Sequence, residues 1–148
     1  MGEAMKLVPD LVPESCFFKN VRSEVSRSVW DKLRRTVYAA AGNRCEVCKG
    51  KGHKHPVEAH EVWEYDEKTG VQKLLKLEAL CPACHEVKHI GLAEIRGRRD
   101  AAIKHMCKVN KITKAKAESV VADAFHVWAK RSQRDWKLDV SFLDKLRT

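Results

Sequence analysis

The 148-residue chain lacks the long apolar segment that a membrane-spanning helix requires. No apolar run approaches the roughly 20 residues needed to cross a bilayer. The start of the chain is interrupted too early, by Lys6 and Pro9, to be read as a signal peptide, and Lys6 also breaks the myristoylation pattern. Internal repeats and low-complexity segments are absent as well. We therefore expect an intracellular, cytoplasmic protein in a reducing compartment, with no membrane partner.

Acidic residues are comparatively scarce. There are 20 Asp and Glu against 29 Lys and Arg, so the formal net charge is +9. Such an excess favours a polyanionic partner such as nucleic acid, although a solvated basic surface without a partner is the alternative. The densest basic stretch follows residue 91, and a stretch of this kind can follow a phosphate backbone. Its candidate nucleic-acid-binding residues are Arg96, Arg98, Arg99 and Lys104. Nothing in it resembles a base-reading code, so we expect little sequence specificity.

The length favours one domain of residues 1–148, with a modest core. We divide it into an N-terminal arm (1–27), a central core (28–91) and a helical extension (92–148). Within the core, apolar periodicity and turn residues predict a helix over 28–41, a hairpin with strands at 57–65 and 71–80, and a helix from Pro82 to His89.

The helical extension carries its own signals. Gly91 predicts a break, and the apolar stripe that follows is Leu92, Ile95, Ala102, Ile103 and Met106. Thr113 is a candidate cap for a last long helix, and we expect the tail from residue 134 to pack back on the domain because it carries several large apolar residues.

Four cysteines stand in two pairs, Cys45-Glu-Val-Cys48 and Cys81-Pro-Ala-Cys84. Two Cys-x-x-Cys pairs in an intracellular protein predict one zinc ion in a tetrahedral site. Four sulfurs leave no open position on the ion, so its role would be structural. Unmetallated cysteines in a reduced core are the alternative.

Three histidines follow a second pattern. His85 and His89 lie four residues apart on the predicted helix, so they share one face, and His60 lies on the predicted strand. Neutral imidazoles converging from two elements would leave open positions on a second divalent cation, as catalytic metals need. Two other interpretations remain: the histidines are idle, or His85 or His89 replaces a cysteine at the zinc.

Residues 28–91 resemble the HNH nuclease family in its form with two zinc-knuckle cysteine pairs. The resemblance rests on Arg44-Cys-Glu-Val-Cys48, on Val57-Glu-Ala-His60-Glu61-Val62, and on Leu80-Cys-Pro-Ala-Cys-His85 with His89. It implies an α+β fold with a ββα-metal core of treble-clef type, a structural zinc, and flanking N- and C-terminal helices. It also implies hydrolysis of nucleic-acid phosphodiester bonds with one divalent cation, and places the metal ligands at His60, His85 and His89.

Two positions depart from the family pattern. Glu61 stands where the family usually has the histidine that acts as general base, and Lys76 stands where an asparagine usually orients that histidine. We assign Glu61 as the candidate base, beside His60 and His85 in the catalytic set. Neighbouring residues on a regular strand point to opposite faces, so Glu61 and His60 share a site only at a bulge or strand end. Glu58, on the His60 face, is a possible substitute.

The sequence thus predicts a metal-dependent endonuclease of HNH type acting on DNA, with a structural Zn²⁺ and a second cation (Mn²⁺, Mg²⁺, Ni²⁺ or Zn²⁺) at the histidines. Imidazole ligands favour Mn²⁺ over Mg²⁺, which prefers oxygen. The rival interpretation is a non-catalytic zinc module that binds nucleic acid or protein. A third is a subunit whose protein partner supplies specificity. The oligomeric state, and the choice among duplex DNA, single strands and RNA, are not indicated.

Overall fold

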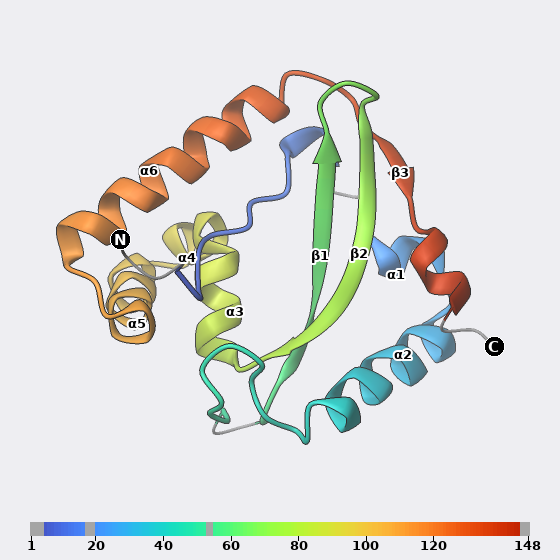
Figure 1. Cartoon of the computed structure of the whole chain (residues 1–148), viewed down its shortest axis with the longest axis horizontal. Coiled ribbons are helices and arrows are strands. Elements are labelled where there is room, and N and C mark those ends of the chain that lie inside the picture. Colours follow the sequence, from blue (N-terminus) through green and yellow to red (C-terminus); the bar gives the residue numbers. More distant parts are fainter. Residues whose placement is uncertain (1–4, 17–19, 53–54, 146–148) are drawn as a thin grey trace.

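The fold is mixed α+β, built around one long hairpin (Figure 1). It comes from a computed structural model that describes residues 5–16, 20–52 and 55–145. The elements run in the order η1 (Glu14–Cys16), α1 (Val21–Glu24), α2 (Arg27–Ala40), β1 (Glu58–Asp66), β2 (Val71–Leu80), α3 (Pro82–Lys88), α4 (Ile90–Ile95), α5 (Arg99–Asn110), α6 (Lys114–Arg131), β3 (Lys137–Asp139) and η2 (Ser141–Lys145). None of the described helices is long and apolar enough to cross a membrane.

The hairpin of β1 and β2 agrees with the strands predicted from the sequence. Its antiparallel register pairs Glu58 with Leu80 and Asp66 with Val71, with a single irregularity between Val62 and Trp63. The connecting turn is closed by the Asp66 side chain, which accepts hydrogen bonds from two backbone N–H groups, and by Gly70 at a φ of 72°. Asp side chains that accept hydrogen bonds from the backbone N–H groups of the residues that follow them are common in turns.

Helix α2 forms where the sequence predicted it. Ser26 caps the helix by accepting a hydrogen bond from the Val29 N–H, and Trp30 and Leu33 form its buried stripe. After the helix the chain turns through Gly42 and Asn43, which both have positive φ. Gly and Asn tolerate this conformation best, and it carries the chain directly into the first cysteine pair.

The break after α3 lies at His89, two residues before the predicted one, and Gly91 belongs to α4. The predicted stripe in this region is only partly correct. Ala102, Ile103 and Met106 are buried, whereas Leu92 is 45% and Ile95 is 84% exposed. Because α4 is a separate short helix with its own axis, a periodicity carried across residues 92–106 does not describe one face.

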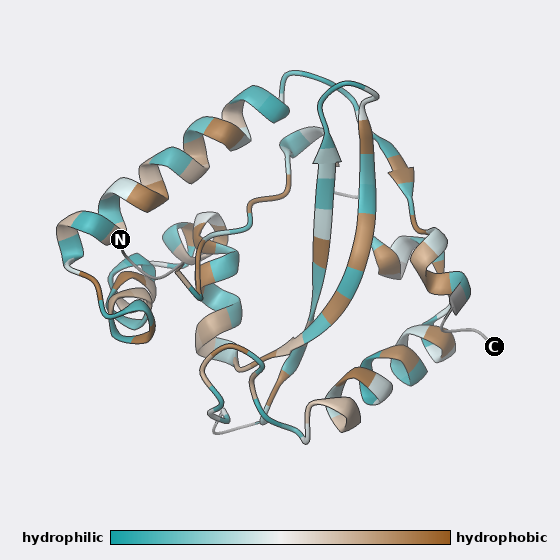
Figure 2. Ribbon diagram, in the orientation of Figure 1, coloured by the Kyte–Doolittle hydropathy of each residue, from teal (hydrophilic) through white to brown (hydrophobic). Residues whose placement is uncertain are grey.

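Two apolar clusters flank the hairpin. One cluster joins α3, α4, α5 and α6 to Leu7 of the N-terminal arm. The other joins α2 to Trp63, Leu74 and Leu77 of the hairpin. Figure 1 shows α3–α6 on one side of the strands and α1 and α2 on the other, and Figure 2 shows apolar and polar residues interleaved along them. The N-terminal arm is part of this core, since Leu7, Cys16 and Val21 are fully buried.

The C-terminal tail packs back as predicted. β3 adds a parallel strand to β2, pairing Val71 with Lys137, and Leu143 of η2 is buried. Trp136 is 1% exposed; its Nε1–H donates to the Arg131 carbonyl, and its ring meets Tyr65 edge-on at 5.2 Å. Trp136 therefore links the end of α6 to the tip of the hairpin.

We expect Trp136→Ala to lower the free energy of unfolding by about 3–5 kcal/mol, because it removes a buried ring and leaves a cavity. Trp136→Phe keeps most of the apolar volume and should cost less. Urea titration followed by circular dichroism measures both. Equal stability of the parent and the alanine variant would contradict the placement of the tail against the hairpin.

Candidate metal centres

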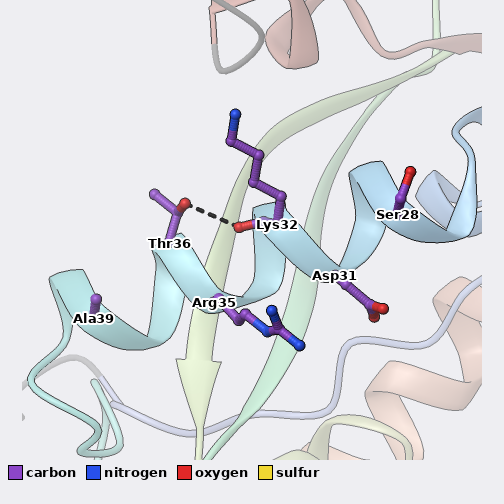
Figure 3. A pocket seen from close by; sticks show the side chains of 6 residues that line it. All are labelled: Ser28, Asp31, Lys32, Arg35, Thr36 and Ala39. Atoms are coloured by element: carbon purple, nitrogen blue, oxygen red, sulfur yellow. Dashed lines mark hydrogen bonds between the residues drawn. The ribbon is translucent and has the colours of Figure 1, made fainter.

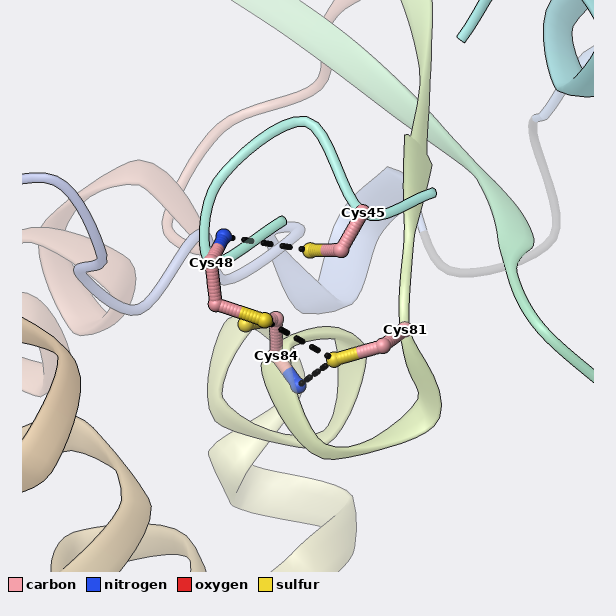
Figure 4. A group of neighbouring side chains, drawn as sticks. All are labelled: Cys45, Cys48, Cys81 and Cys84. Atoms are coloured by element: carbon pink, nitrogen blue, oxygen red, sulfur yellow. Dashed lines mark hydrogen bonds between the residues drawn. The ribbon is translucent and has the colours of Figure 1, made fainter. Parts of the chain in front are cut away.

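The four paired cysteines meet at one point, as the sequence predicted (Figure 4). Their sulfur atoms all lie within 4.8 Å of one another, and the sulfurs of Cys48 and Cys81 are 3.6 Å apart. Zn–S bonds of about 2.3 Å in a tetrahedron put sulfurs about 3.8 Å apart. The cluster can therefore hold a metal ion such as zinc with little rearrangement.

Backbone groups around this cluster favour thiolates. The N–H groups of Cys48 and Cys84 donate to the sulfurs of Cys45 and Cys81, and the Gly50 N–H donates to the sulfur of Cys48. Cys81 is also the N-cap of α3, where the helix dipole favours negative charge. Donors aimed at sulfur stabilise the deprotonated ligands that zinc requires.

Without a cation, the four clustered thiols cannot all lose their protons. A hydrogen bond from Cys84 lowers the pKa of Cys45 to about 4, whereas burial raises the pKa of Cys81 to about 11. The same hydrogen bond to Cys45 raises the pKa of Cys84. One thiolate in the cluster therefore suppresses the others, and a divalent cation would remove that repulsion.

His105 also reaches the cysteines, a contact that the sequence did not predict. Its Nε2 lies 3.2 Å from the sulfur of Cys84. The residue comes from α5, outside the two Cys-x-x-Cys pairs. Ring N–H groups that donate to a metal-bound sulfur fix the ligand and moderate its charge.

The three histidines form a second cluster between β1 and α3. His60, His85 and His89 each offer a nitrogen, and these atoms all lie within 4.8 Å of one another. Their ring centroids are 4.8–5.3 Å apart, in edge-on arrangements. His60 is 2% exposed, and the side chain of His85 is 22% exposed. The helical spacing of His85 and His89 and the position of His60 on the facing strand account for the cluster, as predicted.

Two carboxylates bind these rings from outside the cluster. Asp10 lies 3.0 Å from Nε2 of His60, and Glu58 lies 3.1 Å from Nδ1 of His85. An ionised carboxylate only accepts, so each neutral ring carries its proton on the bonded nitrogen and its lone pair on the other. For His60 that other atom is Nδ1, which is buried and has no partner among the described residues. A lone pair of this kind suits a metal ligand.

The protonation states also fit metal binding. Burial, followed by the neighbouring His85 and His60, lowers the pKa of His89 to about 4. Hydrogen bonds from His85 and from His55 lower the pKa of Glu58 to about 2, against the opposing effect of burial. At neutral pH His89 is therefore neutral and Glu58 ionised, as a ligand and its supporting carboxylate need to be. Of the two histidines that shortly precede β1 in the sequence, His55 contacts Glu58 and His53 lies outside the described residues.

The structure places Glu61, the candidate base, away from the face of β1 that carries His60. β1 is regular between His60 and Glu61, so the two side chains point to opposite faces. The Glu61 carboxylate accepts a hydrogen bond from the Val21 N–H at 2.9 Å, on the face covered by α1 and α2. Lys76 lies 3.7 Å from Glu78 and is 56% exposed. Glu58, the possible substitute on the His60 face, lies beside the histidine cluster, where its carboxylate contacts His85.

The basic stretch after α3 is less free than the sequence suggested. Arg98 forms a bidentate ion pair with Glu86, and Arg99 forms ion pairs with Glu94 and Glu118. These pairs hold α3, α4, α5 and α6 together and neutralise two of the four arginine and lysine candidates. Arg96 and Lys104 are exposed, and no described carboxylate pairs with either.

A shallow hollow on the outer side of α2 is separate from both clusters (Figure 3). All but one of its lining residues are polar or charged, and none of the clustered cysteines or histidines is among them. The lining residues are Ser28, Asp31, Lys32, Arg35, Thr36 and Ala39.

Comparison of the chain with protein-family models, curated proteins and solved structures gives no match. The function therefore has to be argued from the two clusters and the charge of the chain.

We expect the purified protein to contain one zinc per chain, held by the cysteines. Cys84→Ser should lose the zinc and destabilise the fold, because the hydroxyl is a poor substitute for a thiolate ligand. Cys107→Ser, at a half-buried cysteine outside the cluster, is the matched control and should keep the metal. Elemental analysis of both variants measures this. Zinc retained at parental stoichiometry in Cys84→Ser would exclude the four-sulfur site.

Proposed function

We propose that the chain is a metal-dependent endonuclease that hydrolyses phosphodiester bonds in DNA. The observation that carries the proposal is the cluster of His60, His85 and His89, three imidazoles that each offer a nitrogen, with these atoms within 4.8 Å of one another. Three protein ligands leave positions for substrate or water, unlike the four sulfurs of the cysteine cluster. The resemblance of residues 28–91 to HNH nucleases, which rests in part on the same three histidines and also on the cysteine pairs, is a second support.

A divalent cation at the three histidines would act as a Lewis acid on a phosphate oxygen and offset the charge that develops during hydrolysis. The side chains of the chain prepare that role. Glu58 holds the Nδ1–H of His85, which leaves Nε2 as the ligand atom. His89 stays neutral because of its lowered pKa. The partial exposure of His85 gives a substrate access to the cluster.

The charge of the chain supports a polyanionic substrate. The net charge of +9 remains after the internal ion pairs are formed, since each pair is neutral. Among the four candidate contact residues after α3, Arg96 and Lys104 are exposed and have no described carboxylate partner. Contacts of this type are sequence-independent, which suits a nuclease of low specificity.

One observation favours a second candidate, a non-catalytic metal-stabilised module that binds nucleic acid or protein. Glu61 is turned away from the histidines and held by the Val21 N–H, so the position expected to supply the base contributes none. In this alternative the histidine cluster binds a cation without cutting.

The test is nicking of supercoiled plasmid by the zinc-loaded protein in Mn²⁺. We expect the parent to nick, and to do so faster in Mn²⁺ than in Mg²⁺ because imidazole ligands suit Mn²⁺ better. His85→Ala should reduce the rate by about 100-fold or more through loss of a ligand. His126→Ala, at an exposed position on α6, is the matched control for the same substitution and should cut like the parent.

The variants separate the two candidates. Cutting that persists in His85→Ala would come from a contaminant or another site and would refute the proposal. No cutting by any protein, with zinc and DNA binding intact, would favour the binding module.

A second prediction concerns the DNA contact. Arg96→Ala and Lys104→Ala together should weaken binding to duplex DNA and reduce the slope of log affinity against log salt by about 2, one unit for each lost phosphate contact. Lys68→Ala, on the hairpin turn, should leave the slope unchanged. Fluorescence anisotropy over a salt series measures both; equal slopes in all proteins would place the DNA elsewhere.

A further inference from the structure

The N-terminal arm places one carboxylate against the histidine cluster. Asp10 lies 50 positions before His60, outside the segment that carries the nuclease-like motifs, and its Oδ2 is 3.0 Å from Nε2 of His60. The side chain of His60 is 2% exposed, whereas that of Asp10 is 27% exposed. One buried ring is thus bonded at one nitrogen and lacks a described partner at the other, Nδ1.

The position of Asp10 is held from three helices. Its own N–H donates to the Lys88 carbonyl at the end of α3. Leu7 exchanges two hydrogen bonds with the Asn110 side chain of α5, and the Val12 carbonyl accepts from the Trp128 indole of α6. A segment fixed before and after Asp10 keeps the carboxylate in one place.

If the Asp10–His60 hydrogen bond had only a structural role in the core, nothing would require Nδ1 of His60 to lack a partner. A buried polar atom without a partner destabilises the fold, because it has lost its hydrogen bonds to water. Here the atom belongs to a ring whose neighbours are His85 and His89, and the three residues offer nitrogens within 4.8 Å of one another. A cation among them would satisfy Nδ1 and remove that cost.

We propose that Asp10 is a positioning residue of a three-histidine metal site: it accepts the Nε2–H of His60 and so directs the Nδ1 lone pair toward His85 and His89. The carboxylate acts through His60 rather than as a ligand. Metal binding at the cluster then depends on the docked N-terminal arm. This inference rests on the metal site of the proposed function, but it does not require that the site cuts DNA.

The experiment measures Mn²⁺ binding rather than cleavage. Protein with one zinc per chain is titrated with Mn²⁺, and the free ion is followed by its electron paramagnetic resonance signal. Asp10→Asn should weaken Mn²⁺ binding by about 10–100-fold, the usual effect of removing an outer carboxylate. Asp10→Glu should recover part of the affinity, and His60→Ala should abolish specific binding.

Glu14→Gln is the matched control, because it removes the same charge from the same arm at a residue whose N–H bonds Ser132 rather than a histidine. It should bind Mn²⁺ like the parent. Zinc content and thermal unfolding establish that each variant is folded. Parental affinity in folded Asp10→Asn would overturn the proposal, and so would a parent that binds no Mn²⁺. Mn²⁺ binding that depends on Asp10, without nicking, would support it while refuting the nuclease.

A measurement on the parent alone covers the case in which Asp10 variants do not fold. Long-range ¹H–¹⁵N correlation spectra of the imidazoles report which nitrogen carries the proton. We expect His60 as the Nε2–H tautomer in metal-free histidine sites with the zinc retained. An Nδ1–H tautomer would contradict the inference, because that nitrogen could not then bind the ion.

Discussion

The convergence of four sulfurs is the constraint on which the rest of the structure depends. Cys45 and Cys48 precede β1, and Cys81 and Cys84 follow β2. The cluster therefore joins the segment before the hairpin to the segment after it. It also fixes the first turn of α3, since Cys81 is the N-cap of that helix. Once α3 is fixed beside the hairpin, His85 and His89 have to face β1, and the strand alternation brings His60 to meet them. The cysteine cluster thus determines the geometry of the histidine cluster without contributing to its chemistry.

The two clusters differ in the property that separates structural from reactive metal sites. The cysteine cluster offers four ligand atoms, and three of the four residues are buried. Backbone N–H groups donate hydrogen bonds to the sulfurs of Cys45, Cys48 and Cys81. The histidine cluster offers three ligands, two of them partly exposed, and its outer partners are carboxylates. A closed tetrahedral set excludes substrate, whereas an incomplete set leaves room for it. The Glu61 side chain, on the opposite face of β1, does not complete the second set.

What the sequence could predict was governed by whether motif spacing or apolar periodicity marks the residues involved. The helix at 27–40, both strands, the cysteine cluster and the histidine cluster depend on local spacing, and these predictions were correct or nearly so. Glu61 lies on the face of β1 opposite to His60 for a local reason, because side chains alternate along a strand that is regular at this point. Asp10 and His105 could not be found, since neither belongs to a motif or a periodic pattern and their contacts depend on how the segments pack. The ion pairs of Arg98 and Arg99 have the same origin, as a count of charges does not say which are already neutralised.

These long-range contacts change how the chain should be divided. The sequence suggests a core at 28–91 with an arm before it and helices after it. In the structure each cluster takes a polar partner from outside that core, Asp10 from the arm for the histidines and His105 from α5 for the cysteines. The apolar cluster beside α3 also includes Leu7 and residues of α5 and α6. A fragment limited to 28–91 would therefore keep every cysteine and histidine of both clusters and lose the polar partners of two of them. The flanking segments belong to the two clusters as much as the motifs do.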